Sequence, residues 1–117
     1  MILGVGVDLV ETARFLRPSK AFLQRVFTSA ERTYAGRHAD PAERLAARFA
    51  AKEAVMKALG TGWAKGISWK DIETVGTRLR VRGKAAKIAK SLGITRWHLS
   101  ISHSGGFAVA VVVAEGG

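Results

Sequence analysis

Two carboxylates and a lysine are the residues of this sequence best suited to chemistry. Asp8 is a lone acid within an apolar run at the start of the chain, and Glu53 and Lys57 lie four residues apart in an alanine-rich segment. A carboxylate in apolar surroundings is costly unless it is paired, caps a helix or binds a metal. Two ordinary interpretations stay open: Asp8 and Glu11 match a helix-capping box, and Glu53 with Lys57 matches a surface ion pair.

Two further stretches carry polar groups beside glycines. Gly60-Thr61-Gly62 follows Lys57, and it is either a helix C-cap or a loop that brings N–H groups near a phosphate. The spacing of a Walker loop is absent. His103 and Ser104 end a predicted strand before a glycine turn, but no nucleophile elbow accompanies them, and a lone turn histidine is more often solvated.

Charge narrows the class of partner. Lysine and arginine number 19 against 9 acids, a net charge of +10, which implies nucleic acid, a phosphate-rich small molecule or an acidic protein. Composition alone favours nucleic acid. The chain has no cysteine, which excludes disulfides, thiolate metal sites and cysteine nucleophiles.

Length and hydropathy indicate one compact domain. The 117 residues are 48% hydrophobic, enough for a single core. The apolar start lacks a basic region and meets Asp8 early, so it is not read as a signal peptide. No apolar run approaches the ~20 residues that span a bilayer, and we expect a cytoplasmic protein without membrane contact.

The first half of the chain predicts one buried strand and several helices. Residues 2–10 form a near-continuous apolar run, in which Gly4, Gly6 and Asp8 share one face with open space. Residues 11–17 and 20–27 look helical, and Thr28 with Glu31 forms a capping box for a helix to about Tyr34. A helix over 41–59, capped by Asp40 and Pro41, has no clean solvated face.

The second half predicts strands and one more helix. The strands are residues 71–75, 78–82, 97–102 and 107–114, with a helix over 84–92 closed by Gly93. Strands and helices mix without a regular βαβ rhythm, which predicts an α+β fold with a small antiparallel sheet and helices packed on it.

Three stretches together resemble the holo-acyl-carrier-protein synthase family of 4′-phosphopantetheinyl transferases. They are residues 4–11 (GVGVDLVE), residues 48–62 (RFAAKEAVMKALGTG) and residues 98–104 (HLSISHS). The middle stretch is the specific one, and the likeness covers nearly the whole chain. It implies that 4′-phosphopantetheine passes from coenzyme A to a serine of an apo-acyl carrier protein, with release of 3′,5′-ADP, in fatty acid biosynthesis.

The resemblance also implies roles for individual residues. Asp8 and Glu53 match carboxylates that bind Mg²⁺, and Lys57 matches a lysine that contacts the transferring phosphate. The residues implied to line the coenzyme A pocket are Arg48, Lys52, Lys57, Gly60, His103 and Ser104. The residues implied to dock the acidic carrier protein are Arg14, Arg17, Lys20 and Arg25, which otherwise match a solvated helix face.

The resemblance further implies a homotrimer with active sites at subunit interfaces. One departure concerns the hairpin around Gly76, which is shorter than is common in the family and lacks its proline. In the family this region helps wall the adenine pocket, so of all the implied contacts those with adenine are the ones that the resemblance supports least. Two other functions have less support from the sequence. The first is a nucleic-acid-binding domain, but the sequence contains no helix-turn-helix signature, no RNP aromatics and no KH loop. The second is a structural subunit without activity, which would leave Asp8, Glu53 and Lys57 unexplained.

Overall fold

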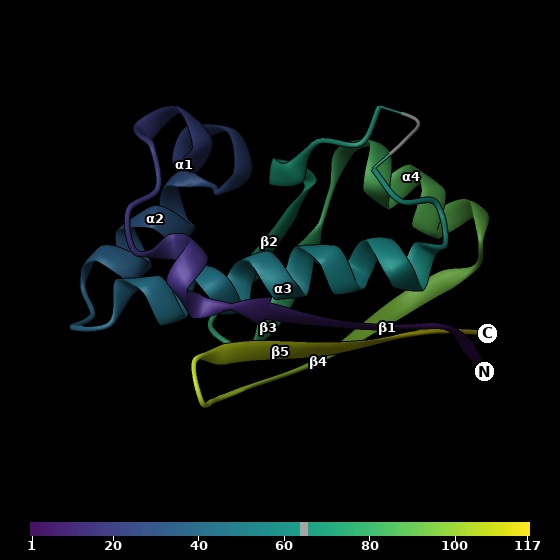
Figure 1. Ribbon diagram of the computed structural model, residues 1–117. Helices are drawn as coiled ribbons and strands as arrows, with labels where there is room; N and C mark the ends of the chain where they lie inside the picture. Colours follow the sequence, from purple (N-terminus) through teal and green to yellow (C-terminus); the bar gives the residue numbers. More distant parts are fainter. Residues whose placement is uncertain (64–65) are drawn as a thin grey trace.

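The computed structural model describes residues 1–63 and 66–117 and is built around one long helix, α3 (Pro41–Leu59). This helix lies across a three-stranded antiparallel sheet of order β1-β5-β4, formed by β1 (Ile2–Glu11), β5 (Phe107–Gly116) and β4 (Ile94–Ser104). Figure 1 shows the sheet on one side of α3 and the remaining elements around its other sides. The predicted α+β class is confirmed.

The remaining elements form two groups. Before α3 come η1 (Thr12–Phe15), α1 (Lys20–Val26) and α2 (Ser29–Gly36). After it come η2 (Trp69–Asp71), the antiparallel pair β2 (Ile72–Val75) and β3 (Arg78–Val81), and α4 (Gly83–Ser91). The predicted elements are therefore all present, except that residues 11–17 contain only a short 3₁₀ turn. None of the helices in the described part of the chain is long and apolar enough to cross a membrane.

Helix α3 has the bounds that the sequence predicts, but one of its caps differs. Pro41 opens the first turn, and Gly60 closes the helix in the left-handed region, its N–H bonded to the carbonyls of Met56 and Lys57. The Asp40 side chain makes no capping hydrogen bond; its Oδ1 instead accepts from Arg44 Nε at 3.3 Å. The prediction that Asp40 caps through its side chain was wrong, because the arginine one turn later takes the carboxylate.

The glycines of β1 serve close packing, and the predicted open space beside Asp8 is absent. A Cβ added at Gly4 or Gly6 would collide with the backbone carbonyl oxygens of Ala58 and Ala54 on α3. Alanines on the helix and glycines on the strand therefore let the two backbones approach closely. This contact holds the inner face of β1, to which Asp8 also belongs, directly against α3.

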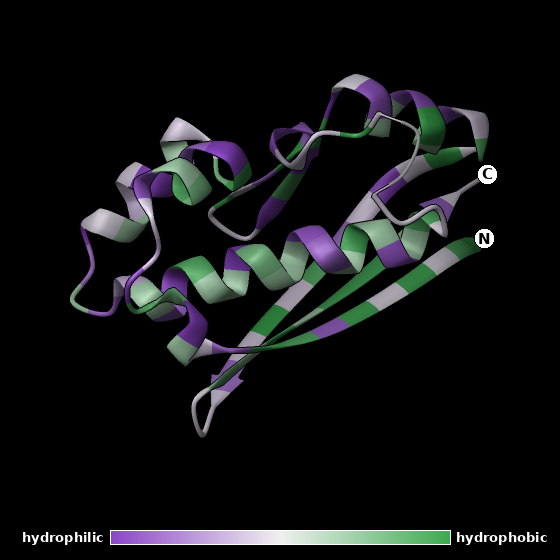
Figure 2. Cartoon of the chain, turned by 45° about the horizontal axis from the view of Figure 1, so that its top comes forward, coloured by the Kyte–Doolittle hydropathy of each residue, from purple (hydrophilic) through white to green (hydrophobic). Residues whose placement is uncertain are grey.

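Only that inner face of β1 is covered, so the prediction of a fully buried strand was wrong. On the outer face Val5, Val7 and Leu9 are 59%, 52% and 62% exposed. Figure 2 shows hydrophobic and less hydrophobic positions alternating along the strand that begins at the N-terminus. The apolar run looked continuous because both faces carry non-polar residues, although α3 covers only one of them.

The capping box that the sequence predicts at the start of α2 is present in the structure. The Thr28 hydroxyl accepts from the Glu31 N–H and the Glu31 carboxylate accepts from the Thr28 N–H, the reciprocal pair of a capping box. A cluster of four aromatic rings anchors η1 and α1 to α3. The rings that pack on one another are those of Phe15, Phe22, Phe27 and Phe49. The N-terminal ammonium donates to the Gly116 carbonyl, so the two chain ends lie side by side (Figure 1).

Candidate active site

The structure joins Asp8 to Lys57 where β1 crosses the C-terminal half of α3. Lys57 Nζ lies 3.1 Å from Asp8 Oδ1 and also donates to the Val7 carbonyl at 3.0 Å. The Asp8 side chain is only 15% exposed, whereas that of Lys57 is 54% exposed. The carboxylate is therefore fixed on the inner face of the strand, and the ammonium lies at its solvent side.

Glu53 lies one helical turn before Lys57 on the same side of α3. It is half-buried, and its Oε1 accepts a hydrogen bond from the indole Nε1 of Trp63 at 3.0 Å. Asp8, Glu53 and Lys57, which we call the carboxylate–lysine cluster, thus come from one strand and one helix. The capping interpretation of Asp8 is wrong, because β1 continues to Glu11 and the following turn has no side-chain cap.

The donor set of this cluster fits one kind of metal ion. Within residues 1–63 and 66–117, no three histidine, cysteine or acidic side chains gather closely enough to hold a metal. Zinc and calcium sites usually need such a set. Mg²⁺ needs only one or two protein carboxylates, because water and substrate phosphate complete its shell. Two carboxylates with hard oxygen atoms therefore fit Mg²⁺.

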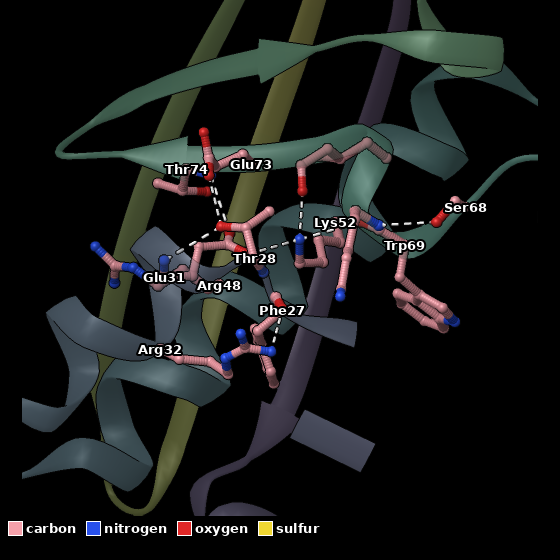
Figure 3. A network of polar contacts seen from close by, with 12 residues as sticks. Phe27, Thr28, Glu31, Arg32, Arg48, Lys52, Ser68, Trp69, Glu73 and Thr74 are labelled. Carbon is pink, nitrogen blue, oxygen red and sulfur yellow. Dashed lines mark hydrogen bonds and ion pairs between the residues drawn. The ribbon is translucent and has the colours of Figure 1, made fainter. Parts of the chain in front are cut away.

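Lys52, next to Glu53 in sequence, points the opposite way into the interior. Its ammonium lies 2.9 Å from Glu31 Oε1 and donates to the carbonyls of Trp69 and Ile72, as Figure 3 shows. Both side chains of the Lys52–Glu31 pair are fully buried. Burial lowers the pKa of Lys52 from its ordinary value, and the Glu31 carboxylate opposes that shift.

The buried pair belongs to a network that ties α2 and α3 to β2. Glu31 Oε2 accepts from the Thr74 N–H, and Glu73 accepts from the Thr28 hydroxyl (Figure 3). Glu73 also accepts from Arg82. The prediction that Lys52 lines the coenzyme A pocket was therefore wrong. A helix that is buried on most sides gives no periodic signal for which of its charges face solvent.

Arg48 lines a separate cleft on the other side of α3. The cleft has a volume of about 140 Å³ and is partly open to solvent, and its walls include Tyr34, Arg44, His103 and the Gly76–Thr77 turn. The Arg48 guanidinium stacks 4.1 Å from the centre of the Tyr34 ring, and one of its nitrogens donates to the Arg44 carbonyl. Burial lowers the pKa of Arg48, but an arginine stays charged in proteins, so the cleft is cationic.

The other residues predicted to line the coenzyme A pocket do not all lie in the Arg48 cleft. His103 lines the Arg48 cleft and also the edge of a second hollow, with its Nδ1 3.8 Å from Glu43 Oε2. Ser104 alternates to the outer face of the sheet and lines a shallow hollow with Leu9 and Phe107. The Gly60 N–H is occupied by the helix cap, which confirms the C-cap interpretation and removes that N–H as a phosphate donor.

The four predicted docking residues are all exposed and follow one another around the η1–α1 corner. Arg14 lies on η1, Arg17 follows it, and Lys20 and Arg25 lie on α1. The Arg14 guanidinium lies 5.3 Å from the centre of the Phe49 ring, so the charged group contacts an aromatic ring while the residue stays exposed. The charges occupy two elements and not one helix.

Sequence reasoning missed three residues near these sites. Arg44 lines the cleft one turn before Arg48, a spacing that the sequence does contain. Tyr34 reaches the cleft only because α2 packs on α3, and Trp63 reaches Glu53 only because the loop after Gly60 folds back. No pattern within the local sequence predicts either contact.

The fold and these sites define a class of transferases. Residues 4–112 match the model of the 4′-phosphopantetheinyl transferase superfamily, and the chain belongs to that family.

Among similar proteins, the holo-[acyl-carrier-protein] synthase of Anaeromyxobacter dehalogenans (strain 2CP-C) is 48% identical over 99% of this chain and 98% of its own length. Two solved structures are also similar. The holo-[acyl-carrier-protein] synthase of Neisseria meningitidis has a TM-score of 0.83 and 36% identity, with 98% of this chain and 99% of that chain covered. The synthase of Bacillus anthracis str. Ames, in complex with CoA (3′,5′-ADP), has a TM-score of 0.81 and 38% identity, with 100% and 99% covered.

Proposed function

We propose that this chain is an enzyme that transfers 4′-phosphopantetheine from coenzyme A to a serine of an apo-acyl carrier protein and releases 3′,5′-ADP. The observation that carries the proposal is the carboxylate–lysine cluster, in which Lys57 contacts Asp8 and follows Glu53 by one helical turn. It lies in a chain that belongs to the 4′-phosphopantetheinyl transferase superfamily and resembles named synthases over nearly its full length.

Asp8 and Glu53 would hold Mg²⁺ between the protein and the pyrophosphate of coenzyme A. When bound, the ion neutralises phosphate charge and polarises the bond to the leaving 3′,5′-ADP. Asp8 suits this role because β1 and α3 fix its position while part of its carboxylate remains accessible.

Lys57 would stabilise the negative charge that builds on the phosphoryl oxygens as the carrier serine attacks. Its ammonium is more than half exposed, and its present partners, Asp8 and the Val7 carbonyl, hold it at the edge of the cluster. A positioned cation of this kind contributes through electrostatics, without becoming a nucleophile. The lysine therefore orients and stabilises, and the attacking oxygen comes from the carrier protein.

The Arg48 cleft would take the nucleotide end of coenzyme A. Arg48, Arg44 and His103 gather cationic and hydrogen-bonding groups around a space walled by the Gly76–Thr77 turn. Phosphate is the anion that guanidinium groups bind best. Although the hairpin is short, its turn still forms one wall of the cleft. Ser104 and Gly60 do not line this cleft, and a contact of either residue with coenzyme A stays a prediction.

Two features favour a trimer in which neighbouring subunits complete each site. The carboxylate–lysine cluster and the Arg48 cleft face different sides of one chain, so two copies side by side can present both to one coenzyme A. The outer face of strands β1 and β5 is also apolar, and a contiguous exposed apolar patch marks an interface. The residues of that face are Val5, Val7, Leu9, Val109, Val111 and Val113. Light scattering coupled to size-exclusion chromatography measures the mass directly.

The basic corner of η1 and α1 would dock the carrier protein. Arg14, Arg17, Lys20 and Arg25 present exposed positive charge, and carrier proteins are acidic. The net charge of +10 is thereby assigned to two anionic partners, coenzyme A and the carrier. The nucleic-acid alternative gains no support from the relatives. A cytoplasmic location remains a prediction.

Mass spectrometry of an apo-acyl carrier protein incubated with this protein, coenzyme A and Mg²⁺ tests the proposal. We expect one added phosphopantetheine group, lost with Asp8→Ala and with EDTA. Glu115→Gln is the matched control, because it removes an exposed carboxylate near the chain ends, away from both sites. If several apo carriers gain no mass with folded protein, the transferase proposal fails and nucleic-acid binding becomes the leading alternative.

A further inference from the structure

Within residues 1–63 and 66–117, one hydrogen bond reaches Glu53 from outside the carboxylate–lysine cluster. The indole Nε1 of Trp63 donates to Glu53 Oε1 at 3.0 Å. Indole is a donor without an acceptor, so its preferred partner is a carboxylate and not a lysine or an amide N–H. The bond engages Oε1 and leaves the second oxygen of Glu53 to meet another ligand.

An aromatic stack holds the Trp63 ring in place. Its centre lies 3.7 Å from that of Trp69, and Trp69 stacks on Phe49 of α3 with centres 5.1 Å apart and planes 21° from parallel. The backbone carbonyl of Trp69 in turn accepts from the buried Lys52. The indole that meets Glu53 is therefore fixed to the same helix that carries Glu53, one turn after Phe49.

We propose that Trp63 is a positioning residue: its N–H orients the Glu53 carboxylate and thereby strengthens Mg²⁺ binding at the cluster. The terminal torsion of a glutamate side chain is broad, so without a partner the carboxylate samples many orientations. Hydrogen bonds from a second layer of residues orient metal-binding carboxylates, and their loss costs about 10–100-fold in metal affinity or activity. The inference rests on the proposed function, because it assigns Glu53 to the metal.

The stacked pair supplies a matched control. Trp63→Phe keeps an aromatic ring on Trp69 and removes the N–H that Glu53 receives. Trp69→Phe changes the other ring of the same stack and leaves that N–H in place; its carbonyl, which Lys52 uses, belongs to the backbone. Both variants lose one indole from the same cluster, so a difference between them reports the hydrogen bond and not the packing.

Spectroscopy tests the hydrogen bond without any turnover. The chain has three tryptophans, so ¹⁵N-labelled protein gives three indole N–H signals, which Trp→Phe variants assign. We expect the Trp63 signal to shift on Glu53→Gln and again on addition of Mg²⁺ to the coenzyme A complex. The Trp97 signal should stay fixed. A Trp63 signal that ignores both changes would overturn the inference.

Calorimetric titration of Mg²⁺ into the coenzyme A complex tests the consequence. We expect Trp63→Phe to raise the Kd for Mg²⁺ by about 10–100-fold, with turnover recovering at excess Mg²⁺, and Trp69→Phe to stay within about threefold of the unsubstituted protein. Equal Mg²⁺ affinity for Trp63→Phe and the unsubstituted protein, both active, overturns only this inference. Absence of Mg²⁺ binding and transfer in the unsubstituted protein overturns the proposed function, and this inference with it.

Discussion

Helix α3 carries two lysine–carboxylate pairs whose contacts look alike and whose surroundings differ. Lys52 lies 2.9 Å from Glu31, and Lys57 lies 3.1 Å from Asp8. The first pair is fully buried, whereas the Lys57 side chain is 54% exposed. The short distance alone therefore does not distinguish a structural ion pair from one at a reactive site.

Burial separates the roles of the two pairs. The Lys52 ammonium has a carboxylate and two backbone carbonyls as partners, so no position remains for a substrate. Removing such a buried charge from water is costly, and its partners repay that cost only while all are present. Lys57 is exposed and Asp8 is partly exposed, so each can exchange its partner for a phosphate or a metal ion. The comparison supports a structural role for Lys52 and is consistent with the proposed catalytic role of Lys57.

The largest expected effect is on stability and comes from the buried pair. Lys52→Ala leaves Glu31 charged and unpaired inside the protein, which should lower the free energy of unfolding by about 3–5 kcal/mol. Urea denaturation followed by circular dichroism measures it. Lys57→Ala is the control, and because that lysine is exposed, we expect a loss of at most about 1 kcal/mol. If both variants lost the same free energy of unfolding, the two ion pairs would not differ in their contribution to stability.

The next effect is on turnover and comes from the exposed cluster. Asp8→Asn keeps the size of the side chain and removes its charge, so transfer should slow by more than about a hundredfold, since the lost stabilisation is worth several kcal/mol. The rate of holo-carrier formation is measured with Asp40→Asn as control. A variant that transfers at the normal rate would exclude Asp8 from the reaction.

A smaller effect concerns encounter with the carrier protein. Charge reversal in Lys20→Glu/Arg25→Glu should raise the KM for the carrier about tenfold at low salt, with a smaller difference at high salt, because screening weakens charge steering. Lys84→Glu/Lys87→Glu on α4 is the matched control, since those lysines are also exposed. If both double variants change KM equally, net charge matters and the η1–α1 corner does not.

The smallest effect is a pH dependence of stability far from the sites. The hydrogen bond with His98, aided by Arg96, holds the pKa of Glu115 below its ordinary value of 4.5. A carboxylate with a lowered pKa in the folded state stabilises it above the unfolded pKa, and this contribution disappears as pH falls through the folded pKa. In Glu115→Gln, the melting temperature should therefore rise less steeply with pH between about pH 3 and pH 6 than it does in the unsubstituted protein. An unchanged slope would show that the pair is not formed in solution.

The sequence predicts most of the backbone of this fold for identifiable reasons. Pro41 and Gly60 mark the ends of α3, and Thr28 with Glu31 marks the start of α2. These signals act within a few residues, so no knowledge of packing is needed. The α+β class follows from the same local elements.

Local sequence patterns did not predict which way the side chains of buried helices and strands point. Lys52 and Glu53 are neighbours on a helix whose surroundings are mostly buried, and only the position of β2 shows that Lys52 points inward. The glycines of β1 suggested open space, although α3 fills it. Tyr34 and Trp63 reach the candidate sites through contacts between distant segments, which the periodicity within one element does not encode.

The most direct test of this account measures phosphopantetheine transfer per folded molecule in Glu53→Gln and Lys52→Met. These two residues adjoin in sequence, and circular dichroism at reduced temperature gives the folded fraction of each variant. The account predicts that Lys52→Met lowers stability but keeps transfer within about threefold, whereas Glu53→Gln remains folded and loses more than about a hundredfold. Normal transfer by folded Glu53→Gln, or its loss in folded Lys52→Met, would contradict it.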